Sequence, residues 1–344
     1  MTRRGGMLAI LGVVLAGSIF AATAFGSVQI PSRAVAAALA GWVPGFDVGG
    51  ASPTQHAIVV HLRLPRVLLA ALVGGGLALC GAVLQGLFRN PMADPGIIGV
   101  SSGAALGAVC AVTSGLALAH SWLLPLSAFV TGAGATFAIY QLSTRHGRTP
   151  LAGLLLAGLA ISALLSALTS FVLGLARNIL ILRELIFWLL GGLDGRGWPQ
   201  LRLIVLPTLV GAAALLLFAR ELNLLAASGE EGALSLGVEI EWLKRGLLVL
   251  TALVTGAVVS VSGTIGFVGL LVPHAVRMLT GPDHRLLLPA SFLAGASFLV
   301  WADLLTRALS PTEDLRLGVV TAAVGAPFFL FLLQRHRSRV EPLG

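Results

Sequence analysis

The amino-acid sequence predicts an all-α polytopic membrane protein with ten transmembrane helices. Apolar residues make up 57% of its 344 residues and charged residues only 10%, whereas soluble domains carry about 25% charged residues. The apolar residues are also gathered into repeated runs of about 20, the length that a helix needs to cross the hydrocarbon core of a bilayer. No polar interval is long enough to fold as a separate soluble domain. Residues 1–344 are therefore expected to form one transmembrane domain.

The first apolar run follows Thr2-Arg3-Arg4 and extends from Met7 to Gly26. A cleaved signal peptide is the alternative, because Ala22-Thr23-Ala24 resembles a cleavage site. The run is longer than the apolar region of a signal peptide, which usually has about 7–15 residues. We therefore expect an uncleaved first helix.

An outer segment over residues 28–62 follows, in which Pro31 starts a short interfacial helix that ends near Trp42. Residues 179–192 are apolar but short and predict a half-helix that does not cross the membrane. The other nine predicted crossings are 64–88, 97–117, 121–142, 150–175, 200–219, 243–262, 264–280, 286–309 and 316–334.

The net charge of +8 indicates how these helices are oriented. In a membrane protein, a surplus of arginine points to loop orientation and anionic headgroups rather than to nucleic acid. With the N-terminus inside, 13 of the 22 Lys and Arg residues lie at inner ends of the predicted helices. This weak bias fits the positive-inside rule, so both termini are expected in the cytoplasm.

Motifs of a catalytic or metal site are missing from the sequence. The only lysine, Lys244, is not part of a Gly-Lys-Ser/Thr motif, so ATP and its magnesium ion would have to be bound by a partner chain. Cys80 and Cys110 lie in separate apolar runs, and the seven histidines lack metal-ligand spacing, so we expect no metal and no cofactor on this chain. Gly99–Gly103 fits the G-x-S-x-G motif of serine hydrolases, but it opens a predicted membrane helix instead of following a strand.

Small residues recur every four positions on two predicted helices. Gly99, Gly103 and Gly107 should let a neighbouring backbone approach closely. The predicted helix 150–175 carries a longer ridge, for which helix packing and the lining of a translocation path are equally open readings. This ridge consists of Gly158, Ser162, Ser166, Ser170 and Gly174.

The segment 220–245 is the most acidic part of the chain and lies between two predicted crossings. Apolar residues at helical spacing, interrupted by Gly229, predict two short amphipathic helices joined by a glycine turn. Helices that lie on membranes usually have a basic polar face. The acidic character therefore favours a protein partner.

Several long motifs closely resemble the transmembrane permease subunits of bacterial ABC importers for iron-siderophores, haem and cobalamin. They begin with R-L-P-R at Arg63–Arg66 and QGLFRNPMADPGIIGVSSGA at Gln85–Ala104, and continue through Gly229–Gly237, Gly263–Arg277 and Gly318–Pro327. The resemblance implies a type II importer permease in the bacterial inner membrane. It further implies a homodimer with the path at its two-fold interface, two ATP-binding cassette subunits, and a periplasmic substrate-binding protein.

The resemblance also implies roles for residues at the two ends of the path. Arginines matching Arg63, Arg66 and Arg307 receive glutamates of the binding protein in this family. Headgroup snorkelling is the alternative for the first two, and an i,i+4 ion pair with Asp303 for the third. Coupling helices, which sit in a cleft of the ATPase subunit, are implied over 220–242, with Gly229, Glu230, Ala233, Leu236 and Gly237 as the matching residues.

Two further sets of residues are implied by the resemblance to face the path itself. Asn90, Met92 and Thr149 match the positions of the cytoplasmic gate, where methionine replaces the family's common leucine. The fifth predicted helix matches the one that lines the path, which assigns this role to Gly158, Ser162, Ser166 and Ser170.

The sequence thus predicts a non-enzymatic permease subunit of an ATP-driven importer that moves an iron complex, a ferric siderophore or haem, into the cytoplasm, with cobalamin as the alternative. A secondary transporter without an ATPase would need ionisable groups at the membrane midplane. Asp303, near one end of its helix, is the nearest candidate. A membrane hydrolase would use Ser101. For His274 we expect a hydrogen-bonded helix-end position rather than a ligand or proton relay.

Overall fold

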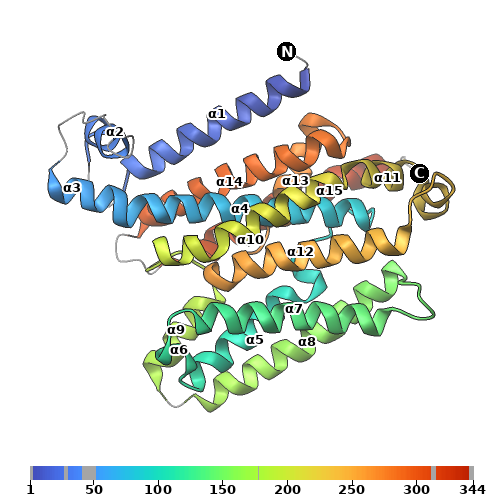
Figure 1. Cartoon of the computed structure of the whole chain (residues 1–344), viewed down its shortest axis with the longest axis horizontal. Helices are drawn as coiled ribbons and strands as arrows, with labels where there is room; N and C mark the ends of the chain where they lie inside the picture. The colour runs from blue at the N-terminus through green and yellow to red at the C-terminus, as the bar shows by residue number, and fades with distance from the viewer. Residues whose placement is uncertain (1–2, 27–29, 41–51, 177, 311–314, 341–344) are drawn as a thin grey trace.

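The computed structural model describes residues 3–26, 30–40, 52–176, 178–310 and 315–340, with only the backbone described for 3–4 and 332–340. In these ranges the chain forms helices and no strand, which confirms the all-α prediction (Figure 1). The predicted interfacial Trp42 lies outside the described residues. The long helices run side by side along one direction, as expected for a membrane bundle.

Seven helices within the described ranges are long and apolar enough to cross a membrane. Three helices with shorter apolar stretches occupy the positions of the other three predicted crossings: α5 (Val100–Thr113), α13 (Val268–Thr280) and α15 (Leu317–Val340), whose apolar stretch ends at Phe331. The seven are α1 (Arg3–Ala24), the continuous helix Pro53–Leu87, α7 (Leu123–Ser143), α8 (Leu151–Leu175), α10 (Trp198–Leu217), α12 (Ile240–Ser262) and α14 (His284–Leu309).

Shorter elements connect these helices at their ends. The predicted half-helix is α9 (Ile179–Leu189), which at 11 residues is too short to cross a bilayer. The predicted interfacial helix is α2 (Ser32–Ala40), and the acidic segment forms α11 (Ala219–Ser235). The remaining connections are α6 (Leu116–Ala119) and the 3-10 turn η2 (Pro95–Ile98).

The second crossing begins earlier than the sequence analysis placed it, at Pro53 instead of residue 64. It consists of α3 (Pro53–Ala57), a π-helical stretch η1 (Ile58–Arg63) and α4 (Leu64–Leu87). Ser52 caps its start: the hydroxyl accepts from the Gln55 N–H, and the Gln55 side chain accepts from the Ser52 N–H. This S-x-x-Q capping box, with proline at the first helical position, was the missed signal.

The helix α4 lies at the centre of the bundle, packed against α10, α12, α13 and α14. In its most apolar stretch 89% of the residues are buried. Its glycines permit this packing: a Cβ on Gly74 would lie 2.2 Å from the carbonyl oxygen of Gly295, and one on Gly81 would lie 1.8 Å from that of Gly269. Backbones in contact without intervening side chains are typical of membrane helix pairs.

A second group of helices, α5, α7 and α8, packs along one side of this centre. The prediction of close approach along α5 is confirmed, because a Cβ on Gly103 would lie 2.5 Å from the Thr131 carbonyl oxygen of α7. A Cβ on Gly107 would lie equally close to the Ser127 carbonyl oxygen. These glycines thus fix the spacing between α5 and α7.

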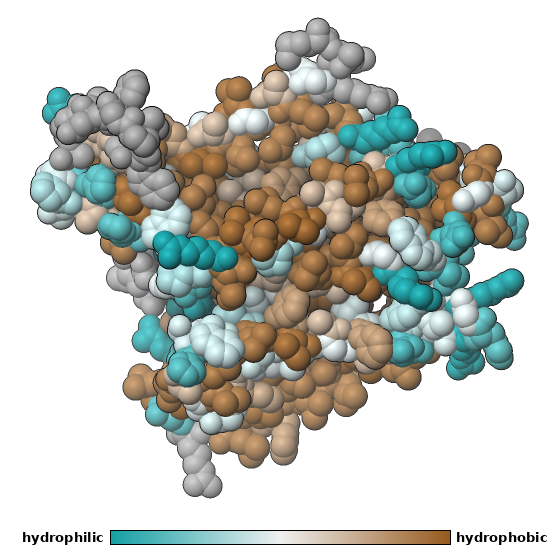
Figure 2. All heavy atoms as spheres, in the orientation of Figure 1, coloured by the Kyte–Doolittle hydropathy of each residue, from teal (hydrophilic) through white to brown (hydrophobic). Residues whose placement is uncertain are grey.

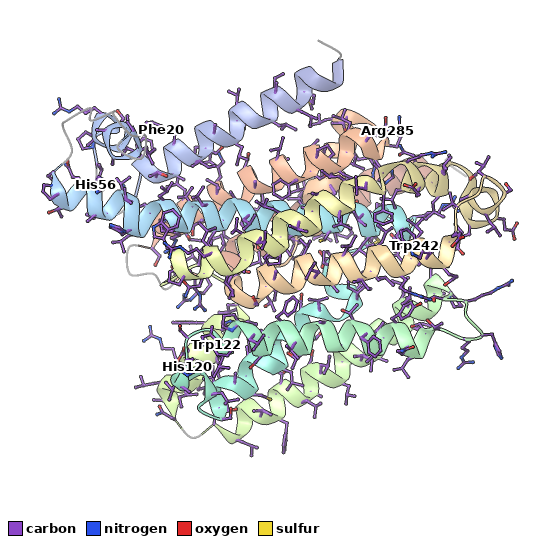
Figure 3. The ribbon with its side chains drawn as sticks, viewed as in Figure 1. Phe20, His56, His120, Trp122, Trp242 and Arg285 are labelled. Carbon is purple, nitrogen blue, oxygen red and sulfur yellow. The ribbon has the colours of Figure 1, made fainter. Side chains whose placement is uncertain are left out.

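The bundle has two polar ends separated by an apolar middle. Figure 2 shows hydrophilic side chains gathered towards the ends and hydrophobic ones between them. We name the end that carries α2, α6 and α9 the outer end, and the end that carries α11 the inner end, following the predicted orientation. The start of α1 and the end of α15 both lie at the inner end. Trp122 lies near the outer end and Trp242 near the inner end (Figure 3), positions that suit tryptophan at headgroup depth.

Candidate functional site

Two of the predicted docking arginines belong to a chain of ion pairs at the outer end. The Asp303 carboxylate is fully buried and lies 2.9 Å from Arg66 Nε and 3.0 Å from Arg307 Nε. Arg66 continues to Asp194, at 2.8 Å from Nη2, and Asp194 continues to Arg316, at 2.5 Å. The i,i+4 alternative for Arg307 is therefore present, and the chain links α4 and α14 with the loop after α9 and the start of α15.

The third predicted docking arginine, Arg63, is held differently. It is the last residue of the π-helical stretch, and its Nη1 donates to the carbonyl oxygens of Thr23 and Ala24 at 3.1 and 2.8 Å. Its guanidinium thereby satisfies carbonyls that the end of α1 leaves without helical partners. The side chains of Arg63, Arg66 and Arg307 all line one hollow of about 600 Å³, so the three arginines predicted from separate segments do come together.

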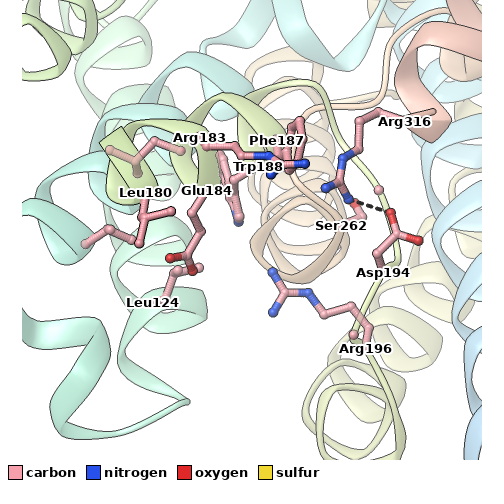
Figure 4. A pocket seen from close by; sticks show the side chains of 14 residues that line it. Leu124, Leu180, Arg183, Glu184, Phe187, Trp188, Asp194, Arg196, Ser262 and Arg316 are labelled. Atoms are coloured by element: carbon pink, nitrogen blue, oxygen red, sulfur yellow. Dashed lines mark hydrogen bonds and ion pairs between the residues drawn. The ribbon is translucent and has the colours of Figure 1, made fainter. Parts of the chain in front are cut away.

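A second hollow of about 410 Å³ lies beside this one, between α9 and the loop that follows it (Figure 4). The Arg316 guanidinium lies 3.8 Å from the centre of the Phe187 ring while it pairs with Asp194. Burial lowers the pKa of Arg196, which lines both hollows. Asp194 is a residue that the sequence analysis missed, and its place beside arginines from distant segments could be found only from the fold.

The glycine motifs around residues 191, 263 and 318 meet at the base of this region. The Gly192 N–H donates to the Ser262 carbonyl at 2.8 Å, and the Gly318 N–H donates to the Gly191 carbonyl at 3.2 Å. The Thr264 hydroxyl donates to the Leu189 carbonyl. The end of α9 is thus joined by backbone hydrogen bonds to the end of α12 and to the start of α15, and by the Thr264 side chain to the loop after α12.

The predicted coupling residues lie together at the inner end: Gly229, Glu230 and Ala233 on α11, and Leu236 and Gly237 directly after it. Gly229 has φ 74° and ψ −175°, a conformation essentially restricted to glycine, and it separates two helical segments as the sequence predicts. In the second segment Ala233 is buried, whereas Leu236 projects outward with 59% of its surface exposed. We call residues 229–237 the coupling segment. Its exposed end carries both apolar and acidic side chains, the mixture expected of a protein-binding surface.

The predicted gate residues lie in two separate turns at the inner end. The turn after α4 contains Asn90, whose Oδ1 accepts from the Met92 N–H at 2.9 Å, and the Met92 side chain is exposed. The turn before α8 contains Thr149, which is fully buried. The first turn also touches the coupling segment: Nη1 of Arg89 would lie 3.3 Å from a Cβ on Gly229.

The buried Thr149 belongs to a polar network around the only lysine of the chain. Lys244 Nζ donates to the Thr149 carbonyl at 2.9 Å, to Glu230 Oε2 at 2.9 Å and to Glu241 Oε1 at 3.2 Å. Glu241 Oε2 in turn accepts from the Thr149 N–H at 3.0 Å. This network is not predictable from the sequence, because no spacing or motif connects residues 149, 230 and 244.

The residues predicted to line the path lie along α8, which is the least buried of the seven helices of spanning length. Only 11% of its apolar stretch is buried within the chain. The ridge is covered at its inner half, where a Cβ on Gly158 would lie 2.2 Å from the Ile97 carbonyl oxygen. It emerges at its outer half, where Ser166 and Ser170 are exposed. Hydroxyl groups on the outer face of a membrane helix are able to hydrogen-bond to a neighbouring helix.

The other candidate residues do not form a second site. Ser101 lies in the first turn of α5, and no strand precedes it in the part of the chain that the structure describes. His274 is partly buried in the middle of α13, so the expected helix-end position was wrong. Within the described residues, no three His, Cys, Asp or Glu side chains are grouped so that they could hold a metal ion.

Comparison with known proteins gives concordant matches over nearly the whole chain. Residues 13–335 match the FecCD transport family. The cobalamin import system permease protein BtuC of Halobacterium salinarum is 49% identical over 84% of this chain and 77% of its own length. The hemin transport system permease protein HmuU of Yersinia pestis is 44% identical over 82% and 84%. A solved structure described as an inward-facing conformation of a metal-chelate type ABC transporter superposes with a TM-score of 0.85, at 33% identity, over 96% of this chain and 99% of that one.

Proposed function

Because this chain belongs to the FecCD transport family and is a permease of an ABC importer, we propose that it moves a bulky metal chelate across the inner membrane at the expense of ATP bound by a partner. The observation that carries this proposal is the kinked, partly acidic coupling segment, which projects from one end of a membrane bundle. A carrier that worked without an ATPase would have no need of such a surface. The translocation path, the docking of the ATP-binding subunits and the docking of the binding protein are proposed in turn below.

The proposed topology has ten crossings with both termini in the cytoplasm. Helices α5, α13 and α15 have apolar stretches of fewer than 18 residues, shorter than the roughly 20 residues that cross a bilayer unaided. Two of them are continued by other backbone conformations, η2 before α5 and Gly263–Phe267 before α13. Such broken crossings are tolerated where neighbouring helices surround them, as they do in this bundle.

The translocation path is proposed to form between two copies of this chain. The exposed flank of α8, with Ser166 and Ser170 among leucines, would then face the two-fold axis. A smooth, mildly polar wall suits a bulky solute, which must pass without being bound tightly. Asn90, Met92 and Thr149 are proposed to narrow the inner mouth of this path.

Energy is proposed to enter through the coupling segment. Two ATP-binding cassette subunits would bind ATP and magnesium, and a cleft in each would receive residues 229–237. Exposed Leu234 and Leu236 provide the apolar contact, and the neighbouring glutamates determine the orientation of docking.

The cargo is proposed to arrive on a periplasmic binding protein that docks at the outer hollow. Arg63, Arg66 and Arg307 line this hollow, and carboxylates of the partner would be drawn to them. Two of the three already pair with Asp303. Docking would therefore add carboxylates to an existing network rather than neutralise free cations.

Cobalamin is the cargo we now propose, with haem as the second candidate. The sequence analysis favoured an iron complex, but a relative at 49% identity is named for cobalamin and one at 44% for hemin. Both cargoes are bulky macrocyclic metal chelates, for which a wide path at a subunit interface is suited. Ferric siderophores become the third candidate.

Uptake measurements test this proposal. In a strain lacking this gene, accumulation of cobalamin is expected to fall to background and to return when the gene is restored, while uptake of haem and of a ferric siderophore stays unchanged. Loss of haem uptake instead would assign the second candidate. Uphill transport by the chain reconstituted alone in liposomes, without any ATP-binding subunit, would refute the ATP-driven mechanism itself.

A further inference from the structure

The only lysine of this protein is buried at the inner end, and its ammonium group is fully used. Only 2% of the Lys244 side chain is exposed. An ammonium group has three N–H donors, and Lys244 Nζ has three acceptors: the Thr149 carbonyl, Glu230 and Glu241. A buried charge is costly unless it is paired and hydrogen-bonded. All three N–H donors of the buried ammonium group are therefore satisfied, two of them by carboxylates.

The three acceptors come from three different parts of the chain. Glu230 belongs to the coupling segment, Glu241 to the first turn of α12, and Thr149 to the turn before α8. Thr149 is held from both sides of its peptide backbone, because its carbonyl accepts from Lys244 and its N–H donates to Glu241. One side chain therefore connects the coupling segment with a predicted gate residue.

The first half of α11 is anchored elsewhere. Asn223 Nδ2 donates to Asp283 Oδ1 at 2.7 Å, and Asn223 Oδ1 accepts from the His284 N–H at 2.8 Å, which fixes this half to the start of α14. The glycine turn at Gly229 separates it from the second half. A displacement of the second half about Gly229 would therefore act on Lys244 while the first half stays attached to the bundle.

The exposure of the charged groups in this network indicates that a docked partner would act on Lys244 through Glu230. Glu230 is the outermost member, with 42% of its side chain exposed, whereas Lys244 is buried. A partner that covers Glu230 would remove water from the ion pair and strengthen it. Docking at the coupling segment would thus tighten the hold of Lys244 on Thr149.

We propose that Lys244 is a positioning residue that transmits displacement of the coupling segment to the inner turn carrying Thr149. This inference rests on the proposed function, since it assumes that an ATP-binding subunit moves residues 229–237. It adds a named physical link between that movement and the gate. Without the ammonium group, the ATP-binding subunits would still dock and hydrolyse ATP, but the turn would no longer follow.

The test compares Lys244→Met with Arg285→Met in complexes reconstituted with the ATP-binding subunits and the binding protein. Methionine keeps an apolar stem and removes the charge. Arg285 is an exposed cation at the same end, in the first turn of α14 and outside the network around Thr149, so it is a matched control. For Lys244→Met we expect the cargo moved per ATP hydrolysed to fall about tenfold, within the usual range of coupling between sites. The ratio for Arg285→Met should equal that of wild type.

A second readout follows the turn directly. In wild type, adding the ATP-binding subunits should slow hydrogen exchange in peptides covering residues 144–150, because docking tightens the network. In Lys244→Met the same subunits should leave this exchange unchanged. A variant that is merely less stable would exchange faster overall, yet would still respond to the subunits.

The outcomes distinguish the role of Lys244 from the proposed function of the whole chain. An unchanged ratio of cargo to ATP in Lys244→Met, or exchange that still responds to the subunits, would overturn the role of Lys244. A wild-type complex that does not pump would overturn the proposed function instead. If Lys244→Met does not fold, Lys244→Gln is measured in the same way, because it retains a donor towards Thr149 and loses the charge that holds Glu230. The same loss of coupling is then expected.

Discussion

Replacing Asp303 with asparagine should destabilise the outer end strongly, although the two side chains have nearly the same shape. The Asp303 carboxylate is fully buried between Arg66 and Arg307. Asparagine keeps one oxygen for Arg66 but turns an NH₂ group towards Arg307, so a donor then faces a donor. Each hydrogen bond to a charged group contributes about 1.5–3 kcal/mol. Breaking a buried pair costs about 3–5 kcal/mol when the remaining charge has no other carboxylate.

The expected loss lies at the lower end of that range, because Arg66 keeps its contact with Asp194 and Arg307 keeps the Ala22 carbonyl at 3.0 Å. We therefore expect the free energy of unfolding to fall by about 3 kcal/mol. Denaturant titration in detergent micelles, followed by tryptophan fluorescence, measures this quantity. Glu231→Gln removes the same charge from an exposed position and should change it by about 0.5 kcal/mol or less. A loss below about 1 kcal/mol for Asp303→Asn, the range of surface ion pairs, would refute the reasoning.

Three further substitutions test other features. Gly229→Ala should destabilise the turn by about 1–3 kcal/mol, because alanine is strained in the backbone conformation of Gly229. The amount of cargo moved per ATP, measured in the reconstituted complex, should then fall. A ratio equal to that of wild type would show that the glycine turn is not required. Gly103→Ala should destabilise by about 1–3 kcal/mol, because its methyl group would meet the Thr131 carbonyl. Gly134→Ala on the open side of α7 should instead be neutral or stabilising by up to about 1 kcal/mol, and equal unfolding free energies for the two would contradict the packing argument. Ser101→Ala should leave uptake at the wild-type level, whereas abolished activity would restore the hydrolase alternative.

The long apolar runs made most of the fold predictable from the sequence. Seven predicted crossings correspond to helices of spanning length, and the half-helix before Gly191 lies where it was expected. The error at Pro53 arose because residues 53–63 are too polar to be read as a crossing. Only the capping box at Ser52 indicates that the helix begins there.

The site was predictable only as far as contiguous motifs reach. The glycine turn at Gly229 follows from local spacing, and the convergence of Arg63, Arg66 and Arg307 was suggested by resemblance. The long-range partners were not predictable, since Asp194 lies 122 residues from Arg316 and Lys244 lies 95 residues from Thr149. Ion pairs of this kind depend on which helices become neighbours, and that information resides in the packing of the whole bundle.

The burial of α4 has a mechanical consequence for transport. Its 24 residues extend about 36 Å at 1.5 Å per residue, so one uninterrupted rod joins the outer hollow to the inner turn. Arg66 stands at one end of this rod and Arg89 just beyond the other. Because neighbouring backbones touch it at Gly74 and Gly81, the rod cannot bend in its middle without separating from α13 and α14. A tilt of this rod imposed at the outer hollow would therefore also displace the turn beside Gly229 at the opposite membrane surface.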